Sequence, residues 1–433
     1  MKHLIVVSVD ALVYEDLEYA KTLPMFGKII KNGAMIEKVK TIYPSLTHPV
    51  HYTMITGCPA GDTKIVSNET FEAGVEVRPW FNYLNETPLE TIFHRAKKAG
   101  LVTAASSWPG TAGGQDVIDY LVPEYFDEDI EKHKDNPIDL FRELGTSEEI
   151  IDIVEHAIER CSITTDHPEC DELQIYCASE IIRRYKPNLL ICHPGFVDGA
   201  RHKSGLFSDK VNESIKQTDD WLKILWDAVC DAGIEDETDF VIVSDHGHLN
   251  ICRIVCPNVY LADAGLIKLD ESGKMKEWDA YIASCALSGQ VYLARPDDEK
   301  LYNKVYTMLK DMAVEKIYGF ESVFTREEVK KMYGLDGDFS FVIETDGYTS
   351  FDESPCRPLV RELNINDYRY GKSTHGHRPE KGPQPVFMGM GPSFKKGVVI
   401  PHGNILNHAP TFAKILGIDL PVSKGTAVRE LLK

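Results

Sequence analysis

Continuous apolar runs recur along this chain, and they constrain its fold more than any other feature of the sequence. The strongest covers Leu4–Val9, and similar runs occupy Leu189–Cys192, Phe240–Val243 and, more weakly, Val386–Met388. Runs of this kind are typical of strands that are buried on both faces of a sheet. Helical patterns lie between the runs, so the sequence predicts an α/β protein with a mainly parallel sheet.

Two of the helical patterns have recognisable ends. Thr87 followed by Pro88 is typical of a helix start, and several apolar residues that follow share one face before Gly100. A second pattern runs from Pro410 to Gly417, and glycine is common just past the end of a helix. We therefore expect one helix to begin at Pro88 and another to stop at Gly417.

The composition excludes several classes of protein. The 433 residues, 43% hydrophobic and 26% charged, are typical of a globular chain with a large core. Lys and Arg number 47 against 67 Asp and Glu, a formal charge of −20, which argues against a nucleic-acid polymer as partner. No apolar run reaches the ~20 residues that span a bilayer, and Asp10 interrupts the first one. We therefore expect a cytoplasmic protein with no membrane partner and with reduced cysteines.

The sequence also suggests how the chain is divided. At ~150 residues per domain, its length fits two or three domains. The segment at about 127–170 is acidic and contains proline, which predicts a helical cover. Residues 255–370 carry strand-like and helical stretches of their own, and we interpret them as an inserted cap subdomain. Residues 1–254 and 371–433 would then form the core.

Carboxylates follow three of the predicted strands. Asp10 ends the first strand, Asp198 comes after the second, and Asp245 and His246 come directly after the third. Ligands of parallel sheets bind beyond the carboxyl ends of the strands. These side chains are therefore expected to share one edge of the sheet.

The carboxylates have histidine neighbours at spacings that suit metal ions. Asp198 and His202 are four residues apart and would share a face of a helix, Asp245 adjoins His246, and His375 supplies a further ligand. Each pair alone is as easily a structural hydrogen bond. Together they favour zinc or manganese, and two ions ~3.5–4 Å apart can clamp both oxygens of an in-line displacement at phosphorus.

Thr47 has the surroundings of a residue at a helix N-terminus. Pro49 suits the first helical turn and Gly57 suits the end of the helix. Free backbone N–H groups and the positive end of the helix dipole would stabilise an alkoxide or a phosphoryl group there. From this stretch alone, Thr47 can equally be a simple N-cap.

Taken together, these motifs resemble the nucleotide pyrophosphatase/phosphodiesterase family of the alkaline phosphatase superfamily. The matching pieces occur in the family's order over almost the whole chain: Asp10, Pro44-x-x-Thr47-x-Pro49-x-His51-Tyr52, Asn68, Asp198-x-x-x-His202, Ser244-Asp245-His246-Gly247 and His375-Gly376. The resemblance implies an alkaline-phosphatase-like three-layer sandwich with a mainly parallel central sheet and a smaller inserted α+β cap domain.

The resemblance also implies roles for the matching residues. Thr47 would be the nucleophile and would form a phospho-threonine intermediate, while Asn68 would bind a phosphoryl oxygen together with the Thr47 N–H. Two divalent ions, Zn²⁺ or else Mn²⁺, would be bound. The first would be held by Asp10, Thr47, Asp245 and His246, and the second by Asp198, His202 and His375.

Two positions differ from family members that act on nucleotides. His48 follows the nucleophile and His193 stands shortly before Asp198, where those members have aromatic residues that stack on the base. We interpret both histidines as substrate-binding residues, and we expect a small phosphate ester as the substrate. His51, His248 and His377 are further histidines that can orient metal ligands.

The predicted function is therefore a two-metal phosphoric ester hydrolase of the phosphodiesterase/nucleotide pyrophosphatase type. One alternative is a phosphomonoesterase or a phosphonate hydrolase of the phosphonoacetate hydrolase type, in which Arg201, Lys203 or Arg378 would bind the substrate carboxylate. Another is a non-catalytic, metal-dependent binding protein. Ser45 is the rival nucleophile to Thr47, and the oligomeric state is left open.

Overall fold

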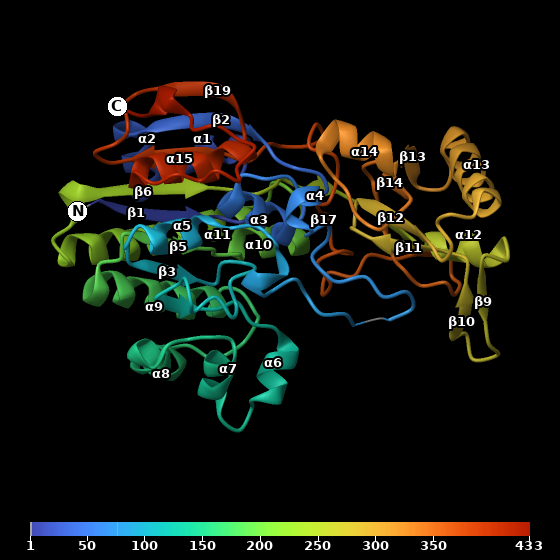
Figure 1. Ribbon diagram of the computed structural model, residues 1–433, viewed down its shortest axis with the longest axis horizontal. Coiled ribbons are helices and arrows are strands. Elements are labelled where there is room, and N and C mark those ends of the chain that lie inside the picture. The colour runs from blue at the N-terminus through green and yellow to red at the C-terminus, as the bar shows by residue number, and fades with distance from the viewer. Residues whose placement is uncertain (1, 76) are drawn as a thin grey trace.

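The computed structural model describes residues 2–75 and 77–433, and within them its main sheet has eight strands in the order β19-β2-β18-β6-β1-β5-β3-β4 (Figure 1). All neighbouring strands pair in parallel except β18, which runs antiparallel to both β2 and β6. The strands are β1 (His3–Ser8), β2 (Ala34–Lys40), β3 (Thr103–Ser106), β4 (Tyr120–Val122), β5 (Leu189–Cys192), β6 (Thr238–Val243), β18 (Phe387–Met390) and β19 (Val399–Asn404). The mainly parallel sheet predicted from the apolar runs is confirmed.

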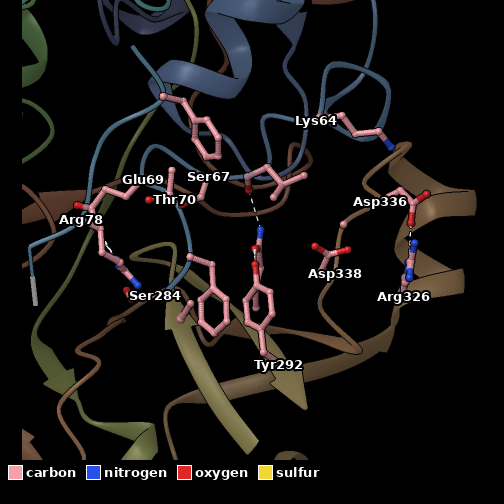
Figure 2. A pocket seen from close by; sticks show the side chains of 16 residues that line it. Lys64, Ser67, Glu69, Thr70, Arg78, Ser284, Tyr292, Arg326, Asp336 and Asp338 are labelled. Atoms are coloured by element: carbon pink, nitrogen blue, oxygen red, sulfur yellow. Dashed lines mark hydrogen bonds and ion pairs between the residues drawn. The ribbon is translucent and has the colours of Figure 1, made fainter. Parts of the chain in front are cut away.

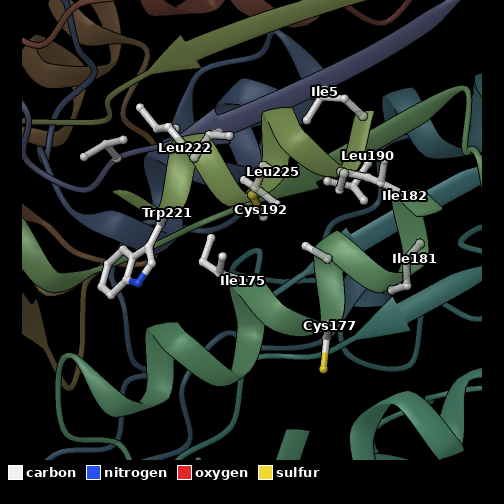
Figure 3. Close-up of a cluster of buried hydrophobic side chains, with 14 of the residues drawn as sticks. Ile5, Ile175, Cys177, Ile181, Ile182, Leu190, Cys192, Trp221, Leu222 and Leu225 are labelled. Atoms are coloured by element: carbon white, nitrogen blue, oxygen red, sulfur yellow. The ribbon is translucent and has the colours of Figure 1, made fainter. Parts of the chain in front are cut away.

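Helices cover both faces of this sheet, because alternate side chains of its central strands point to opposite faces. On one face, Ile5 and Leu190 pack against α9 (Glu169–Tyr185) and α11 (Asp209–Asp231), as Figure 3 shows. On the other face, Leu4 and Val6 belong to the core that includes α3 (Thr47–Thr56), α5 (Ile92–Lys98) and α15 (His408–Leu416). The result is the three-layer arrangement that the family resemblance implies.

The two predicted helix ends had different outcomes. The stop at Gly417 is confirmed, since α15 ends at Leu416 and Gly417 has a φ of +74°. The start at Pro88 is wrong, because α5 begins only at Ile92. The Thr87 hydroxyl accepts the Leu89 N–H at 3.4 Å in a turn. The cap itself is provided further on, where His94 accepts the Thr91 N–H at 3.2 Å.

The chain between β7 (Leu249–Asn250) and β17 (Ser373–Thr374) contains a separate antiparallel sheet with its own apolar core. In Figure 1 this part lies beyond one end of the main sheet. The strands of this part are β8 (Arg253–Val255), β9 (Ile267–Leu269), β10 (Met275–Trp278), β11 (Ala280–Ser284), β12 (Ser288–Leu293), β13 (Phe320–Thr325), β14 (Phe341–Thr345), β15 (Thr349–Phe351) and β16 (Val360–Arg361). The antiparallel sheet has the order β11-β12-β14-β13, and the other strands form the smaller sheets β15-β8-β16 and β10-β9. Its helices are α12 (Pro257–Asp263), α13 (Glu299–Glu315) and α14 (Arg326–Tyr333). The proposed boundaries of the insertion at 255 and 370 stay a prediction.

The two ends of this inserted part are paired with each other. β7 and β17 are antiparallel, with Leu249 opposite Thr374. His248 directly precedes β7 and His375 directly follows β17. Their rings are 5.1 Å apart between centroids. The pairing therefore brings together two histidines that are far apart in the sequence.

The remaining helices complete the layers. The acidic segment 127–170 contains α6 (Asp127–Lys132), α7 (Pro137–Glu143) and α8 (Ile151–Arg160), and α8 packs against α9. Elsewhere lie α1 (Leu17–Ala20), α2 (Pro24–Asn32), α4 (Ala60–Thr63) and α10 (Phe196–Ser204). Within residues 2–75 and 77–433, no helix is both long and apolar enough to cross a bilayer.

Candidate active site

Four polar side chains converge where β1, β6 and the start of α3 meet. Three oxygen atoms surround the Nε2 of His246: Thr47 Oγ1 at 3.2 Å, Asp245 Oδ2 at 3.2 Å and Asp10 Oδ1 at 3.5 Å. Four ligands held tetrahedrally at about 2.0–2.1 Å from one zinc ion would lie about 3.3 Å from each other. The observed spacing fits a shared ion.

Unpaired oxygens in this first ligand group, which consists of Asp10, Thr47, Asp245 and His246, also indicate a cation. Asp10 Oδ1 and Asp245 Oδ2 are buried and have no hydrogen-bond partner among the described residues. Burial and then the charge of Asp198 raise the pKa of Asp10 well above its usual range, and burial and then Asp10 do the same to Asp245. Two buried carboxylates that face each other are costly unless a positive charge lies between them.

Neighbouring groups hold these ligands in place. The Ala11 N–H donates to Asp245 Oδ1 at 3.1 Å, and His193 Nε2 lies 3.1 Å from Asp10 Oδ2. Gly247, which follows His246, has no space for a side chain, because an added Cβ would lie 2.1 Å from the Pro383 carbonyl oxygen. Thr47 is the first residue of α3, as predicted, and α3 stops at Gly57 with a φ of +70°.

The other predicted ligands form a second group around Asp198. On α10, His202 Nε2 is 3.1 Å from Asp198 Oδ2, so the predicted shared helix face is observed. His375 Nε2 lies 4.0 Å from Asp198 Oδ1, and His248 Nε2 lies 2.5 Å from the same oxygen. His248 therefore belongs to this group, where it can ligate or orient an ion.

Hydrogen bonds on the far side of the rings fix which nitrogen faces Asp198. His202 Nδ1 donates to the Ser373 carbonyl at 2.8 Å, and His375 Nδ1 donates to the Ser45 carbonyl at 2.9 Å. Burial lowers the pKa of His375 to about 4, so its ring is neutral. Each Nε2 is then left with a lone pair, as metal coordination requires. The donor set of both groups fits divalent ions.

A cavity of about 460 Å³ joins the two groups. Thr47, Asn68 and His193 all line it. Asn68 Oδ1 accepts the His48 N–H at 3.0 Å, so the amide nitrogen, which also contacts Tyr368, is the end of Asn68 that donates. The N-terminus of α3 and this amide can therefore meet a phosphoryl oxygen next to Thr47.

Aromatic residues that the sequence analysis missed form one wall of this cavity. The Trp80 ring is 5.0 Å from that of Phe126 and 5.7 Å from that of Tyr368, between centroids. His48 lies 5.1 Å from Trp80, and its Nε2 is 3.1 Å from Glu124 Oε2. The wall offers an apolar surface for an organic group attached to a phosphate.

Comparison with known proteins identifies the family. A model of the type I phosphodiesterase/nucleotide pyrophosphatase family matches residues 4–354. The chain belongs to this family. A curated relative, ectonucleotide pyrophosphatase/phosphodiesterase 1 of Saccharomyces cerevisiae, is 25% identical over 398 residues, which are 84% of this chain and 48% of the yeast protein. The human family member 5 is 29% identical over 117 residues, or 25% of this chain and 24% of that protein. The chain spans about half or less of the length of these relatives.

Solved structures of the family share the fold of this chain. Murine ectonucleotide pyrophosphatase/phosphodiesterase 5, an inactive variant with a threonine replaced by alanine and in complex with AMP, superposes with a TM-score of 0.69 at 18% identity. The human counterpart gives a TM-score of 0.66, also at 18% identity, and both matches cover 100% of each chain. The predicted alkaline-phosphatase-like fold and the predicted family are thus confirmed.

Two of the basic residues considered for binding a substrate carboxylate lie elsewhere. Arg201 is fully buried, where its Nε donates to the Ala11 carbonyl at 3.1 Å and its other nitrogens meet Asp16 and Leu206. Arg378 pairs with Glu321 at 3.1 Å, away from the cavity lining. Both are structural because their guanidinium groups are already used. Lys203 is the candidate that lines the cavity.

Ser45 and two other histidines support the site from behind. The Ser45 hydroxyl donates to the His377 carbonyl at 2.9 Å and accepts the Gly376 N–H at 3.1 Å, outside the cavity lining. His377 Nδ1 is 2.9 Å from the same hydroxyl. His51 Nδ1 donates to the Thr47 carbonyl at 2.8 Å. Of the two hydroxyls, the one of Thr47 lines the cavity, so Thr47 is the better nucleophile candidate.

A loop between the core and the insertion carries both Asn68 and Trp80. The Phe81 N–H donates to the Asn68 carbonyl at 2.9 Å, and the buried Arg78 lies between Glu69 and Glu353 at 2.9 and 2.7 Å. Figure 2 shows Arg78 beside Glu69 at one side of a neighbouring cavity of about 390 Å³. Because Glu353 belongs to the inserted part, Arg78 ties that part to the loop.

Replacing Arg78 should therefore disturb the site from a distance. We expect Arg78→Ala to lower kcat/KM for a phosphodiester about 10- to 100-fold, since it leaves two mostly buried carboxylates without their positive charge and frees the loop. Stability should fall by about 2–3 kcal/mol, while the metal content stays unchanged. Arg326→Ala, which removes a more exposed pair with Asp336 across the same cavity, is the matched control and should change neither. Equal effects of the two variants would contradict the positioning role of Arg78.

Proposed function

We propose that this protein is a two-metal phosphodiesterase or pyrophosphatase that uses Thr47 as its nucleophile. The observation that carries the proposal is the position of the Thr47 hydroxyl, at a helix N-terminus, 3.2 Å from His246 Nε2 and open to the cavity. Family membership supports hydrolysis of phosphoric esters. AMP in the murine relative, and the inactivity of its threonine-to-alanine variant, support a nucleotide-like ester and a threonine nucleophile.

Each residue has a defined part in the proposed reaction. Thr47 Oγ1 attacks phosphorus, the bond to the leaving oxygen breaks, and a phospho-threonine forms; water then attacks phosphorus and Thr47 leaves. The Thr47 N–H and the Asn68 amide donate to a phosphoryl oxygen. Zinc or manganese ions at the two groups would supply the positive charge that favours the alkoxide and the phosphoryl oxygens. The cytoplasmic location stays a prediction.

The shape of the cavity favours a diester over the alternatives. The aromatic wall of Trp80, Phe126 and Tyr368 provides a surface for the organic group of the ester. This surface compensates for His48, whose imidazole stacks on a base less well than a larger aromatic ring. Of the three basic residues considered for binding the carboxylate of a phosphonate, Lys203 alone lines the cavity. A non-catalytic binding protein is disfavoured because Thr47 and both ligand groups are in place.

A substrate panel tests this choice. With zinc- or manganese-loaded protein, we expect kcat/KM for an aryl phosphodiester to exceed that for the aryl monoester and for phosphonoacetate by at least about tenfold, since only the diester has a second organic group, besides the leaving group, to bind the aromatic wall. Release of p-nitrophenol and of inorganic phosphate measures the three rates. Faster turnover of the monoester or the phosphonate would establish the alternative, and bound metal without any turnover would establish the binding protein.

A further inference from the structure

His167 lies in the wall of the catalytic cavity, where neighbouring residues hold its ring in place. Its Nδ1 is 2.6 Å from Asp171 Oδ2, and the other oxygen of this buried carboxylate accepts the Gly195 N–H at 2.7 Å. The imidazole lies against two glycines: an added Cβ would be 2.7 Å from the ring at Gly195 and 3.0 Å at Gly199. Asp171 and the glycines therefore fix the ring in one orientation.

The His167 ring lines the catalytic cavity beside the N-terminal turn of α10. Because Nδ1 is bonded to Asp171, the Nε2 is the nitrogen left for a substrate, and the side chain is 31% exposed into the cavity. Gly199 directly follows Asp198, and the charge of His167 also acts on Asp10, so the ring lies near both ligand groups. In-line attack by Thr47 places the leaving oxygen on the opposite side of phosphorus.

The acidic partner also favours a protonated ring. Burial alone would lower the pKa of His167, but the adjacent Asp171 carboxylate and the contact with Cys170 outweigh burial and raise it. A histidine held by a carboxylate in this way is a common proton donor and acceptor in enzymes.

We propose that His167 is a catalytic residue that protonates the leaving oxygen, with Asp171 as its positioning residue. The inference rests on the proposed hydrolysis by Thr47. As the Thr47 alkoxide forms its bond to phosphorus, the leaving oxygen keeps the electron pair of the broken bond and takes the proton from His167 Nε2. The neutral imidazole then takes a proton from the water that attacks the phospho-threonine, and Thr47 leaves again as the alkoxide.

The test compares two leaving groups in the metal-loaded enzyme. Two thymidine 5′-phosphodiesters are used, one of p-nitrophenol and one of a simple alkyl alcohol. For His167→Phe we expect kcat on the alkyl ester to fall at least ~100-fold and kcat on the aryl ester to change less than ~3-fold, because p-nitrophenolate leaves without a proton. Asp171→Asn should cause the same selective loss to a smaller degree. His156→Phe, the same change on the exposed face of α8, should change neither rate.

The outcomes separate this inference from the proposed function. Equal losses on both esters, or no loss on either, would overturn the role of His167, and His167→Gln gives the same comparison should the Phe variant fail to fold. A wild-type enzyme that cleaves neither ester would overturn the proposed function itself, and the inference with it.

Two further readouts do not depend on turnover. In a Thr47→Ala background, His167→Phe should bind the alkyl ester within ~3-fold of the parent by calorimetry, since the proton is transferred only as the bond breaks. Metal content should stay at two ions per chain. A wild type that binds three ions and a His167→Phe variant that binds two would overturn the inference, because His167, Cys170 and Asp171 would then form a metal site of their own.

Discussion

Thr47→Ala protein is expected to lose phosphodiesterase activity by a factor on the order of 10⁴ or more. Removing the nucleophile from a covalent mechanism leaves only binding and electrostatic effects, and losses of this size are typical. The variant should still fold and bind metal, because the Thr47 hydroxyl is only one of the four ligand atoms in its group. Steady-state rates, metal analysis and thermal unfolding measure the three properties.

Ser45→Ala is the paired variant for this prediction. Its hydroxyl lies outside the cavity lining and contacts His377 and Gly376. We expect a loss of tenfold or less, through the placement of His375. Wild-type enzyme quenched during turnover should carry phosphate on Thr47 by peptide mass spectrometry. Near-normal activity of Thr47→Ala, or phosphate found on Ser45, would reverse the assignment.

Removal of the metal ions is expected to abolish activity and to destabilise the fold. An ion present at 100 times its dissociation constant stabilises the folded state by about 2.7 kcal/mol, and two ions add to this. The contribution of two carboxylates to the stability of the metal-free protein should also depend on pH in a defined direction. Asp10 and Asp245 have raised pKa values, so their burial costs little in acid and costs more as pH rises above their ordinary pKa values. Buried histidines such as His246 have lowered pKa values and act in the opposite direction, so the effect of the carboxylates is measured as a difference between variants.

The variant Asp245→Asn tests this pH-dependent cost of burying the two carboxylates. The variant keeps the oxygen that accepts the Ala11 N–H but lacks the charge that faces Asp10. Without metal, it should be more stable than the wild type at neutral pH, by about 1 kcal/mol or more, and the gap should close in acid. With metal, the order should reverse. Thermal unfolding with chelator and with zinc at several pH values tests this, and Asp298→Asn, at the exposed cap of α13, is the control. A gap independent of pH would contradict the electrostatic origin.

The sequence was most informative where chemistry follows regular structure. Asp10, Asp198 and Asp245 could be placed at one edge because each follows a buried strand, and period 3.6 puts His202 beside Asp198. Trp80 and His167 could not be found in this way. Both lie in irregular segments with no periodicity, and only the tertiary fold brings them to the cavity.

The wrong expectations have physical causes as well. Arg201 stands next to His202 in sequence, but adjacent helix residues point about 100° apart, and the guanidinium turns into the protein toward Asp16. His248 lies on a loop two residues after His246, and this spacing predicts no direction for its side chain. Its place beside His375 depends on the pairing of β7 with β17, which is set by residues on either side of the insertion.

That short ladder has an evolutionary consequence. His375 is held by two residue pairs at the base of the inserted part, by the Ser45 carbonyl of the core, and by the Leu287 N–H, which donates to the His375 carbonyl at 3.1 Å. Its position therefore depends on the core, on this ladder and on the turn between β11 and β12. Lineages that keep these contacts could lengthen, trim or exchange other parts of the insertion and inherit an intact metal cradle each time. Substrate preference could then diversify while the reaction at phosphorus was conserved.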